Sequence, residues 1–283
     1  MSNLALSEVR DILCPAWDDL FGPDNPSARL VRDLYFTEVH NRLPPGSWVL
    51  NVGCATGLDA VELARSGVKV WAVDWSPRMV EATVKRARAA GVESRLVARA
   101  IPPGQILSTF SQEIPNERLD GVVAPWGILN LEPDLPGLFD TFYQLLRPSG
   151  RVFTSLLNPR SLTGLMGALK EGQLGETLAR ARAHGDTRGQ WRVAEGLPPM
   201  EVNYPSLEYL HSVYGTRFEL EKRKVAGSVS APSSSGLLRG LRRLEGVLSH
   251  LPIQSVSDQS VLVFRRSVEG MWGPAGPHLL ANE

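Results

Sequence analysis

Short apolar runs alternate with amphipathic stretches through the middle of the chain. The apolar runs predict strands at residues 48–52, 69–74, 95–100, 119–124 and 151–157. Amphipathic stretches at 58–66, 76–90 and 135–147 predict helices between them. In the second of these, Ser76 is a predicted N-cap, Pro77 the first helical residue and Gly91 the residue just past the helix. Strands separated by helices predict right-handed crossovers and a parallel sheet.

Other segments do not follow this rhythm. Residues 1–43 predict helices, one of which has a common apolar face at Leu30, Val31, Leu34, Tyr35 and Val39. Residues 160–204 are rich in glycine and arginine and predict helical pieces without a clear strand. Further on, the pattern predicts a helix at 206–214, a strand at 218–226, an amphipathic helix at 237–251 and a strand at 259–266. Glycines and prolines after residue 267 predict a loosely ordered tail.

Composition and charge exclude several classes of protein. Thirty basic and thirty acidic side chains cancel, so no overall field favours nucleic acid or an anionic membrane. Two cysteines are too few for a disulfide framework. The first twenty residues lack a long apolar run, and no stretch approaches the roughly 18 apolar residues of a membrane span. We therefore expect a cytoplasmic protein with no membrane span and no nucleic-acid partner, whereas the oligomeric state is unknown.

A glycine-containing turn and a strand-end acid provide the candidate chemistry. Residues 49–57 read VLNVGCATG, a strand followed by a turn that opens a helix, which allows a ligand to approach the backbone closely. Asp74 ends the next strand, 21 positions after Gly53, where a carboxylate can accept hydrogen bonds from both hydroxyls of a ribose. A dinucleotide fingerprint requires Gly or Ala at the position of Leu58, whereas here the glycine is Gly57. Alternatively, Asp74 is only a stabilising charge near the helix that begins after Ser76.

The spacing of Gly53 and Gly57 resembles motif I of the class I S-adenosylmethionine-dependent methyltransferases. The segments VDWSPRM (73–79), LDGVV (119–123) and LLRPSGRV (145–152) are similar to the family's second strand, fourth strand and turn before the fifth. Residues 218–226 and 259–266 match its antiparallel closing pair. The resemblance implies an α/β fold with a doubly wound, mostly parallel seven-stranded sheet, helices on both faces, and helical lid insertions.

This resemblance implies S-adenosyl-L-methionine as the cofactor and a division of the chain into parts. The parts are a helical cap (1–43), a Rossmann-like cofactor-binding core (44–159), a helical substrate lid (160–204), the C-terminal part of the core sheet (205–266) with a helical insertion (228–251), and the tail (267–283). The implied cofactor-binding residues are Asn51, Gly53, Cys54, Ala55, Gly57, Asp74, Trp75, Met79, Ala100, Ile101, Pro125 and Trp126. Among them, Gly53 and Gly57 flank the methionine portion, Asp74 holds the ribose and Trp75 stacks beside the adenine.

The chain departs from the family pattern at three positions. Asn51 replaces the usual acid of the first strand, so the site has no charge there for the ammonium group of the ligand. Ala55 replaces the middle glycine, and Ala100 with Ile101 replaces the acid that meets the adenine amine. Backbone groups, or else Gln105 or Gln112, would then recognise adenine.

The acceptor side is less defined. Pro125 and Trp126 resemble only faintly the Pro-Pro-aromatic motif of amino-group DNA methyltransferases, and Asn130 either orients a ligand or caps a turn. His184 is the best-placed base of five histidines, but a lone histidine is more often a packing or surface residue, so the catalytic residue stays unknown. No cluster has metal-ligand spacing, so no metal is predicted.

Two basic segments have two interpretations each. Four arginines in the lid either bind an anionic group of the acceptor or form a solvated face: Arg180, Arg182, Arg188 and Arg192. The helix at 237–251 either packs on the domain or contacts a lipid-like substrate or a membrane surface.

We predict a methyltransferase that acts on a small molecule, with O, N or C as the acceptor atom undecided. A non-catalytic protein with the same fold is the alternative, because Asn51, Ala55 and Ala100 alter the cofactor motif. A nicotinamide-dependent oxidoreductase is a further alternative, against which Leu58 argues.

Overall fold

The computed structural model describes residues 6–113, 118–158, 186–191, 200–215, 217–226 and 259–268. Its N-terminal half contains α1 (Leu6–Leu13), η1 (Cys14–Ala16), α2 (Trp17–Phe21), α3 (Pro26–His40), β1 (Trp48–Val52), α4 (Leu58–Arg65), β2 (Lys69–Asp74), α5 (Pro77–Ala89), β3 (Leu96–Ala100), η2 (Pro103–Gln105), α6 (Ile106–Glu113) and β4 (Leu119–Ala124). The remainder contains α7 (Ile128–Leu131), α8 (Leu135–Leu145), β5 (Leu146–Leu157), β6 (Asp186–Trp191), β7 (Met200–Pro205), α11 (Leu207–Tyr214), β8 (Phe218–Ala226) and β9 (Gln259–Arg266).

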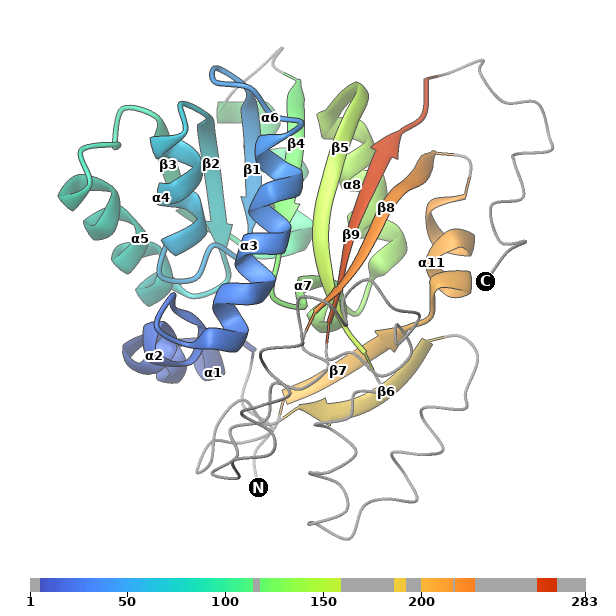
Figure 1. Cartoon of the computed structure of the whole chain (residues 1–283), viewed down its shortest axis with the longest axis horizontal. Coiled ribbons are helices and arrows are strands. Elements are labelled where there is room, and N and C mark those ends of the chain that lie inside the picture. The colour runs from blue at the N-terminus through green and yellow to red at the C-terminus, as the bar shows by residue number, and fades with distance from the viewer. Residues whose placement is uncertain are drawn as a thin grey trace, which may run out of the picture.

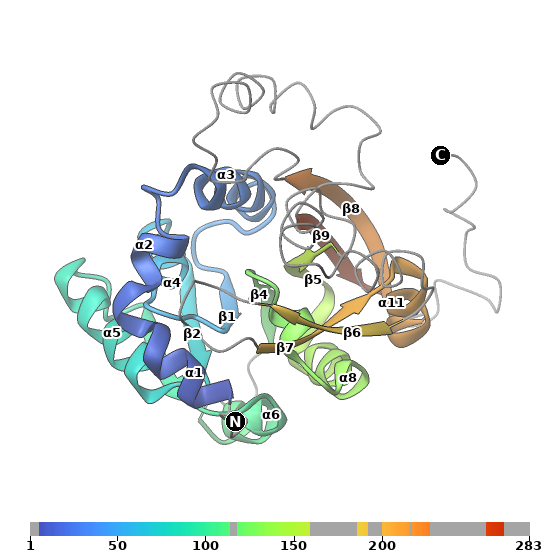
Figure 2. The ribbon, with the colours of Figure 1, turned by 90° about the horizontal axis from the view of Figure 1, so that it is seen from below.

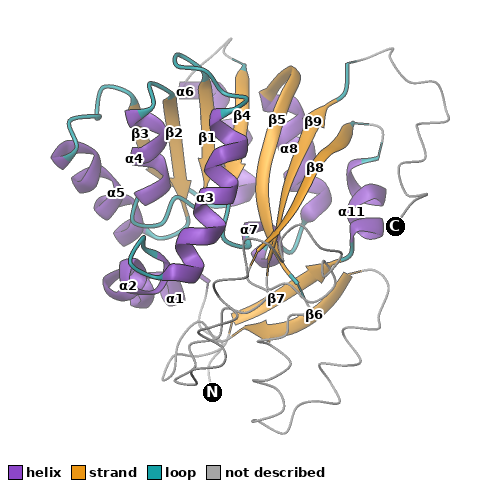
Figure 3. Cartoon of the chain, viewed as in Figure 1, coloured by secondary structure: helices purple, strands orange, loops and turns teal. Residues whose placement is uncertain are grey.

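Seven strands form one sheet in the order β3-β2-β1-β4-β5-β9-β8 (Figure 1). The pairs from β3 to β5 are parallel, whereas β9 is antiparallel to both of its neighbours. Figure 3 shows helices on both faces of this sheet. One apolar cluster joins the sheet to α3, α4 and α5, and a second joins it to α6, α8 and α11. The predicted doubly wound, mostly parallel seven-stranded fold is confirmed.

The local signals read from the sequence account for most element boundaries. The Ser76 side chain accepts a hydrogen bond from the Met79 amide and caps α5, and Gly91 follows this helix with φ +66°. The predicted apolar face of α3 is present, because Val31, Tyr35 and Val39 are buried in the first cluster. By contrast, α8 ends at Leu145 and β5 begins at Leu146. Proline at position 148 disfavours helical geometry in the residue before it, so the helix stops earlier than predicted.

The expectation that residues 160–204 contain no clear strand is wrong for the part that the structure describes. β6 and β7 pair in an antiparallel two-stranded sheet of their own. In β7, apolar Met200 and Val202 alternate with exposed or half-buried positions, a period-two pattern that predicts a strand. β6 has the sequence DTRGQW, which carries no such alternation. Residues 159–185, and with them the predicted helical pieces there, lie outside the described ranges.

Two additions to the sheet lie at the carboxyl ends of its parallel strands. Figure 2, a view from below, shows α1 and α2 near β2 and α5, and β7 near β4. Apolar residues of α1, α2, the Gly53–Gly57 turn, α5, α7 and β7 share a third cluster: Val9, Leu13, Trp17, Ala55, Met79, Leu131, Met200 and Val202. In open α/β sheets this is the edge at which ligands bind. Within the described ranges, no helix has the length and apolar character needed to cross a bilayer.

Candidate functional site

The turn after β1 depends on two glycines with left-handed backbones. Gly53 has φ +68° and Gly57 has φ +83°, values that side chains strongly disfavour. A Cβ at Gly57 would lie 2.8 Å from the Cα of Thr83, and one at Gly53 would overlap the Ile128 side chain. A side chain at Gly57 would therefore collide with α5, and one at Gly53 would collide with α7.

Asp74 lies directly against this turn. Its Oδ2 accepts a hydrogen bond from the amide of Ala55 at 2.9 Å, and Ala55 itself has φ +49°. Its Oδ1 accepts one from the amide of Ser76 at 3.0 Å, so the carboxylate also serves the start of α5, as the alternative interpretation proposed. The structure thus brings together the turn and the acid that the sequence placed 21 positions apart.

Arg10 of α1 fills the remaining acceptor positions of Asp74. Its Nε donates to Oδ1 at 2.9 Å and its Nη2 donates to Oδ2 at 2.5 Å. Arg10 is 2% exposed and Asp74 is 1% exposed, so this is a fully buried, bidentate ion pair. Its guanidinium also lies over the ring of Trp75, 5.2 Å from the centroid, and over the ring of Trp17 at 5.1 Å. Sequence reasoning missed Arg10, because nothing in the pattern of α1 distinguishes it from a surface arginine.

Asn51, near the carboxyl end of β1, has a buried side-chain atom without a hydrogen-bond partner. Its Nδ2 donates to the carbonyl of Val123 on β4 at 3.1 Å. Its Oδ1 is buried and has no hydrogen-bond partner. A buried acceptor without a donor costs free energy, and a ligand donor would relieve this cost.

The other residues predicted around the cofactor lie nearby with different exposures. Cys54 and Met79 are buried, and burial raises the pKa of the Cys54 thiol well above its ordinary value. Ala100 pairs with Asp74 in the register of β2 and β3 and is exposed. The Ile101 amide donates to the Asp74 carbonyl at 3.0 Å. All four therefore border the same strand ends.

Just after β4, Trp126 is held by a second buried carboxylate. Trp126 follows Pro125, is buried, and has φ +60°. Its Nε1 donates to Oδ2 of Asp59 at 2.7 Å, and the Nε of Arg32 donates to Oδ1 at 2.7 Å. The Arg32 guanidinium lies 4.9 Å from the centroid of the Trp126 ring. We call Asp59, Arg32 and Trp126 the Asp59 clamp; only Trp126 was predicted, since neither charge stands in a recognisable motif.

Asn130 joins three elements through backbone hydrogen bonds. Its side chain accepts from the Leu157 amide at 2.9 Å and donates to the Asn203 carbonyl at 2.7 Å. It is fully buried. Its role in the structure is therefore to hold α7 to β5 and β7, which neither prediction for this residue anticipated.

Several candidates from the lid do not form a site in the described chain. Residues 180, 182, 184 and 192 lie outside the described ranges, as does the predicted helix at 237–251. Arg188 is exposed on β6. Among the described residues, no three His, Cys, Asp or Glu side chains are grouped closely enough to hold a metal ion.

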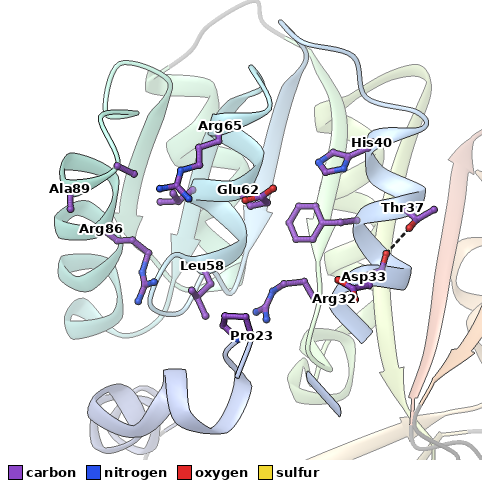
Figure 4. A pocket seen from close by; sticks show the side chains of 13 residues that line it. Pro23, Arg32, Asp33, Thr37, His40, Leu58, Glu62, Arg65, Arg86 and Ala89 are labelled. Atoms are coloured by element: carbon purple, nitrogen blue, oxygen red, sulfur yellow. Dashed lines mark hydrogen bonds between the residues drawn. The ribbon is translucent and has the colours of Figure 1, made fainter. Parts of the chain in front are cut away.

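A groove of about 740 Å³ lies elsewhere, between α3, α4 and α5 (Figure 4). Its charged lining includes Arg32 and Arg86, which are paired with Asp59 and Asp18. None of the predicted cofactor residues lines it. We therefore place the candidate site at the carboxyl ends of β1, β2 and β4.

Comparisons with known proteins find relatives of the central part of the chain. Residues 49–150 match the family described as "Methyltransferase domain". The chain is 30% identical over 151 residues to a ubiquinone biosynthesis O-methyltransferase of Xylella fastidiosa (strain 9a5c), a match that covers 53% of this chain and 57% of that protein. A protein of the same description from Salmonella paratyphi A is 30% identical over 152 residues, 59% of its length. The chain thus spans little more than half the length of these relatives.

Solved structures show the same fold across most of the chain. The CcbJ methyltransferase from Streptomyces caelestis superposes with a TM-score of 0.59 at 18% identity, over 94% of this chain and 100% of the other. The magnesium protoporphyrin IX methyltransferase from Synechocystis PCC 6803, solved with bound SAH, gives 0.56 at 16% identity, over 92% and 98%. At these identities the likeness concerns the fold.

Proposed function

We propose that this chain, whose residues 49–150 match the family described as "Methyltransferase domain", is a class I enzyme that transfers a methyl group from S-adenosyl-L-methionine to a small molecule. The observation that carries the proposal is the convergence of the Gly53–Gly57 turn with Asp74 through the Ala55 amide. This arrangement presents a backbone turn and a carboxylate at one edge of the sheet, the two features that an adenosyl ligand requires.

The residues present fit S-adenosyl-L-methionine. The unpartnered Oδ1 of Asn51 supports a role for this residue as acceptor for a donor of the methionine portion. Asp74 would accept hydrogen bonds from the ribose hydroxyls, and Trp75 would stack beside the adenine, once Arg10 has moved from both. When bound, the cofactor supplies an electrophilic methyl group on a sulfonium; the chain contributes binding and orientation.

The Asp59 clamp supports a positioning role for Trp126 on the acceptor side. Trp126 follows β4, whose carboxyl end faces the transferring methyl in this fold. Because Asp59 and Arg32 fix the indole, its ring would form a rigid wall for an apolar acceptor. The acceptor atom stays open among O, N and C, and we assign no general base. The names of the curated relatives favour oxygen.

A small-molecule acceptor and a cytoplasmic location are also part of the proposal. They are supported by the balanced charge of the chain, which gives no overall attraction to nucleic acid or to a membrane surface.

Calorimetry with S-adenosylhomocysteine tests the proposal. The chain should bind this product, and Asp74→Ala should weaken binding by roughly 1 to 3 kcal/mol through lost hydrogen bonds to the ribose. Asp120→Ala is the matched control, because this carboxylate belongs to β4 but bonds to the Trp48 amide at the start of β1 and should leave affinity unchanged. Absence of binding by the wild-type chain and by Arg10→Ala would reject the proposal.

A non-catalytic protein of the same fold remains the second candidate, and one observation favours it. All acceptor positions of Asp74 are filled by protein groups. Cofactor binding without turnover on any acceptor, together with a partner enzyme that co-purifies, would support this candidate over the methyltransferase.

A further inference from the structure

Arg10 occupies both positions that the proposed function reserves for adenosine. A carboxylate offers about four lone-pair positions for hydrogen bonds. Asp74 fills them with the Nε and Nη2 of Arg10 and with the amides of Ala55 and Ser76. The two amides belong to the turn and to the start of α5, so Arg10 is the partner that a ribose can replace.

The same guanidinium also covers the predicted adenine position. It is a flat, delocalised cation that lies over the ring of Trp75, 5.2 Å from the centroid, on a ring that the proposed function assigns to adenine. Hydrogen bonds to Asp74 and stacking on Trp75 are the two interactions predicted for the adenosine portion of the ligand. Arg10 therefore makes both of them from within the chain, and adenosine cannot make them at the same time.

The helix that carries Arg10 is short enough to move. α1 has 8 residues, and an isolated helix of this length is marginal in water. Its apolar anchor consists of Val9 and Leu13 in the third cluster. Two polar contacts near Asp11 also hold it: the Ser76 hydroxyl donates to the Asp11 carboxylate, and Arg78 donates to the Asp11 carbonyl at 3.2 Å. By contrast, β1, which precedes the Gly53–Gly57 turn, and β2, which ends at Asp74, each have a neighbouring strand on both sides.

We propose that Arg10 closes the adenosine site of the cofactor-free chain, so that cofactor binding and docking of α1 exclude each other. The inference rests on the proposed function, since it takes Asp74 and Trp75 as the ribose and adenine positions. Only chains in which α1 is undocked can then bind the ligand. The apparent affinity is therefore the intrinsic affinity multiplied by the fraction of chains in that state. The N-terminal helix is then an internal competitor of the cofactor.

Calorimetry with S-adenosylhomocysteine on the wild-type chain, Arg10→Ala and Arg78→Ala tests this. If α1 is docked in nine chains of ten, Arg10→Ala should bind about tenfold more tightly than wild type. Arg78→Ala is the matched control, because it removes an exposed contact with α1 and leaves Asp74 paired, so its affinity should stay within about twofold of wild type. Adenosine alone should show the same ratio between wild type and Arg10→Ala, since Arg10 covers only the adenosine positions.

A second measurement follows α1 without relying on heats of binding. Cys14 directly follows α1, is partly buried, and has a pKa that burial raises. Arg10→Ala should speed thiol labelling of Cys14 in the absence of ligand, and saturating S-adenosylhomocysteine should speed it in the wild type. Cys54 is the internal control, because it is fully buried in the turn and should stay unlabelled in the folded chain. Mass spectrometry of the labelled peptides separates the two thiols.

The outcomes separate this inference from the proposed function. Equal binding of S-adenosylhomocysteine by wild type and Arg10→Ala, or slower labelling of Cys14 when it is bound, overturns the competition by Arg10 and leaves the proposed function intact. If Arg10→Ala frees Cys14 but no variant binds S-adenosylhomocysteine or adenosine, the proposed function fails, and the inference fails with it.

Discussion

Two buried aspartates near the Gly53–Gly57 turn have the same kinds of partner, but the arginines that pair with them lie on differently anchored helices. Asp74 pairs with Arg10 of α1, and Asp59 pairs with Arg32 of α3. In both pairs the guanidinium also lies over a tryptophan ring. A buried carboxylate needs such a partner, because losing its hydration costs several kcal/mol. Chemistry alone therefore does not distinguish the two pairs.

The difference lies in the helices that carry the arginines. α3 has 15 residues, and Val31, Tyr35 and Val39 embed it in the first apolar cluster, against the sheet. α1 has 8 residues and packs mainly on the third, smaller cluster. The same type of ion pair can therefore hold its residues in place, as at Asp59, or be displaced by a ligand, as we propose for Arg10 and Asp74. Which of the two applies depends on how much apolar surface holds the helix that carries the arginine.

The largest expected effect is at the clamp. Asp59→Ala leaves Arg32, whose side chain is only 13% exposed, without its carboxylate and the Trp126 indole without its acceptor, so it should lower the free energy of unfolding by about 3 to 5 kcal/mol. Urea denaturation measures this loss. Asp140→Ala is the control, because its ion pair with Arg217 is half exposed and should contribute less than about 1 kcal/mol. A loss at Asp59 no larger than the loss at Asp140 would contradict the clamp.

The next effect isolates the indole from the ion pair. Trp126→Phe keeps an aromatic ring beside Arg32 but removes the Nε1 donor to Asp59. A hydrogen bond to a charged group contributes about 1.5 to 3 kcal/mol, which is the expected loss in the same denaturation experiment. The losses from Asp59→Ala and Trp126→Phe should not add when the two are combined, since each removes the same hydrogen bond between Trp126 and Asp59. Strict additivity would show that the two residues act separately.

Arg10→Ala should lower the free energy of unfolding by less than Asp59→Ala, although the Arg10–Asp74 pair is more deeply buried than the Arg32–Asp59 pair. The loss cannot exceed the cost of undocking α1, after which water reaches Asp74, so we expect about 1 to 2 kcal/mol. Hydrogen exchange should show the change confined to α1 and its contacts, while the amides of α3 keep their protection. A loss as large as that of Asp59→Ala, spread over both helices, would mean that α1 is anchored as firmly as α3.

The smallest effect concerns a third buried carboxylate. Glu132 is 6% exposed, and among the described residues no lysine or arginine is paired with it; burial raises its pKa above the ordinary value of 4.5. Its contribution to stability is therefore greatest below about pH 4.5 and is lost as the pH rises through the raised pKa. Glu132→Gln can keep the hydrogen bond from the Asp134 amide and should stabilise the chain by less than about 1 kcal/mol at pH 7. Unfolding measured at pH 4 should show no difference, and a gain at pH 4 equal to that at pH 7 would contradict this.

Sequence alone predicted the sheet and the edge at which the candidate site lies, because these depend on local patterns. Apolar runs gave strands, Ser76 and Gly91 marked the ends of α5, and Gly53, Gly57 and Asp74 marked the strand ends. The alternation at Met200 and Val202 also predicts a strand and was overlooked. Local rules suffice here, since backbone geometry and solvent exposure act over a few residues.

Only the tertiary structure decided which charges meet. Arg10 and Asp74 are 64 positions apart, and Arg32 and Asp59 are 27 apart. No period or motif links such residues, because their contact depends on how α1 and α3 dock on the sheet. The sequence by itself determined the Gly53–Gly57 turn and the strand-end acid Asp74. The packing of the N-terminal helices determined which charged side chains lie against them, since a buried charge takes the partner that folding brings to it.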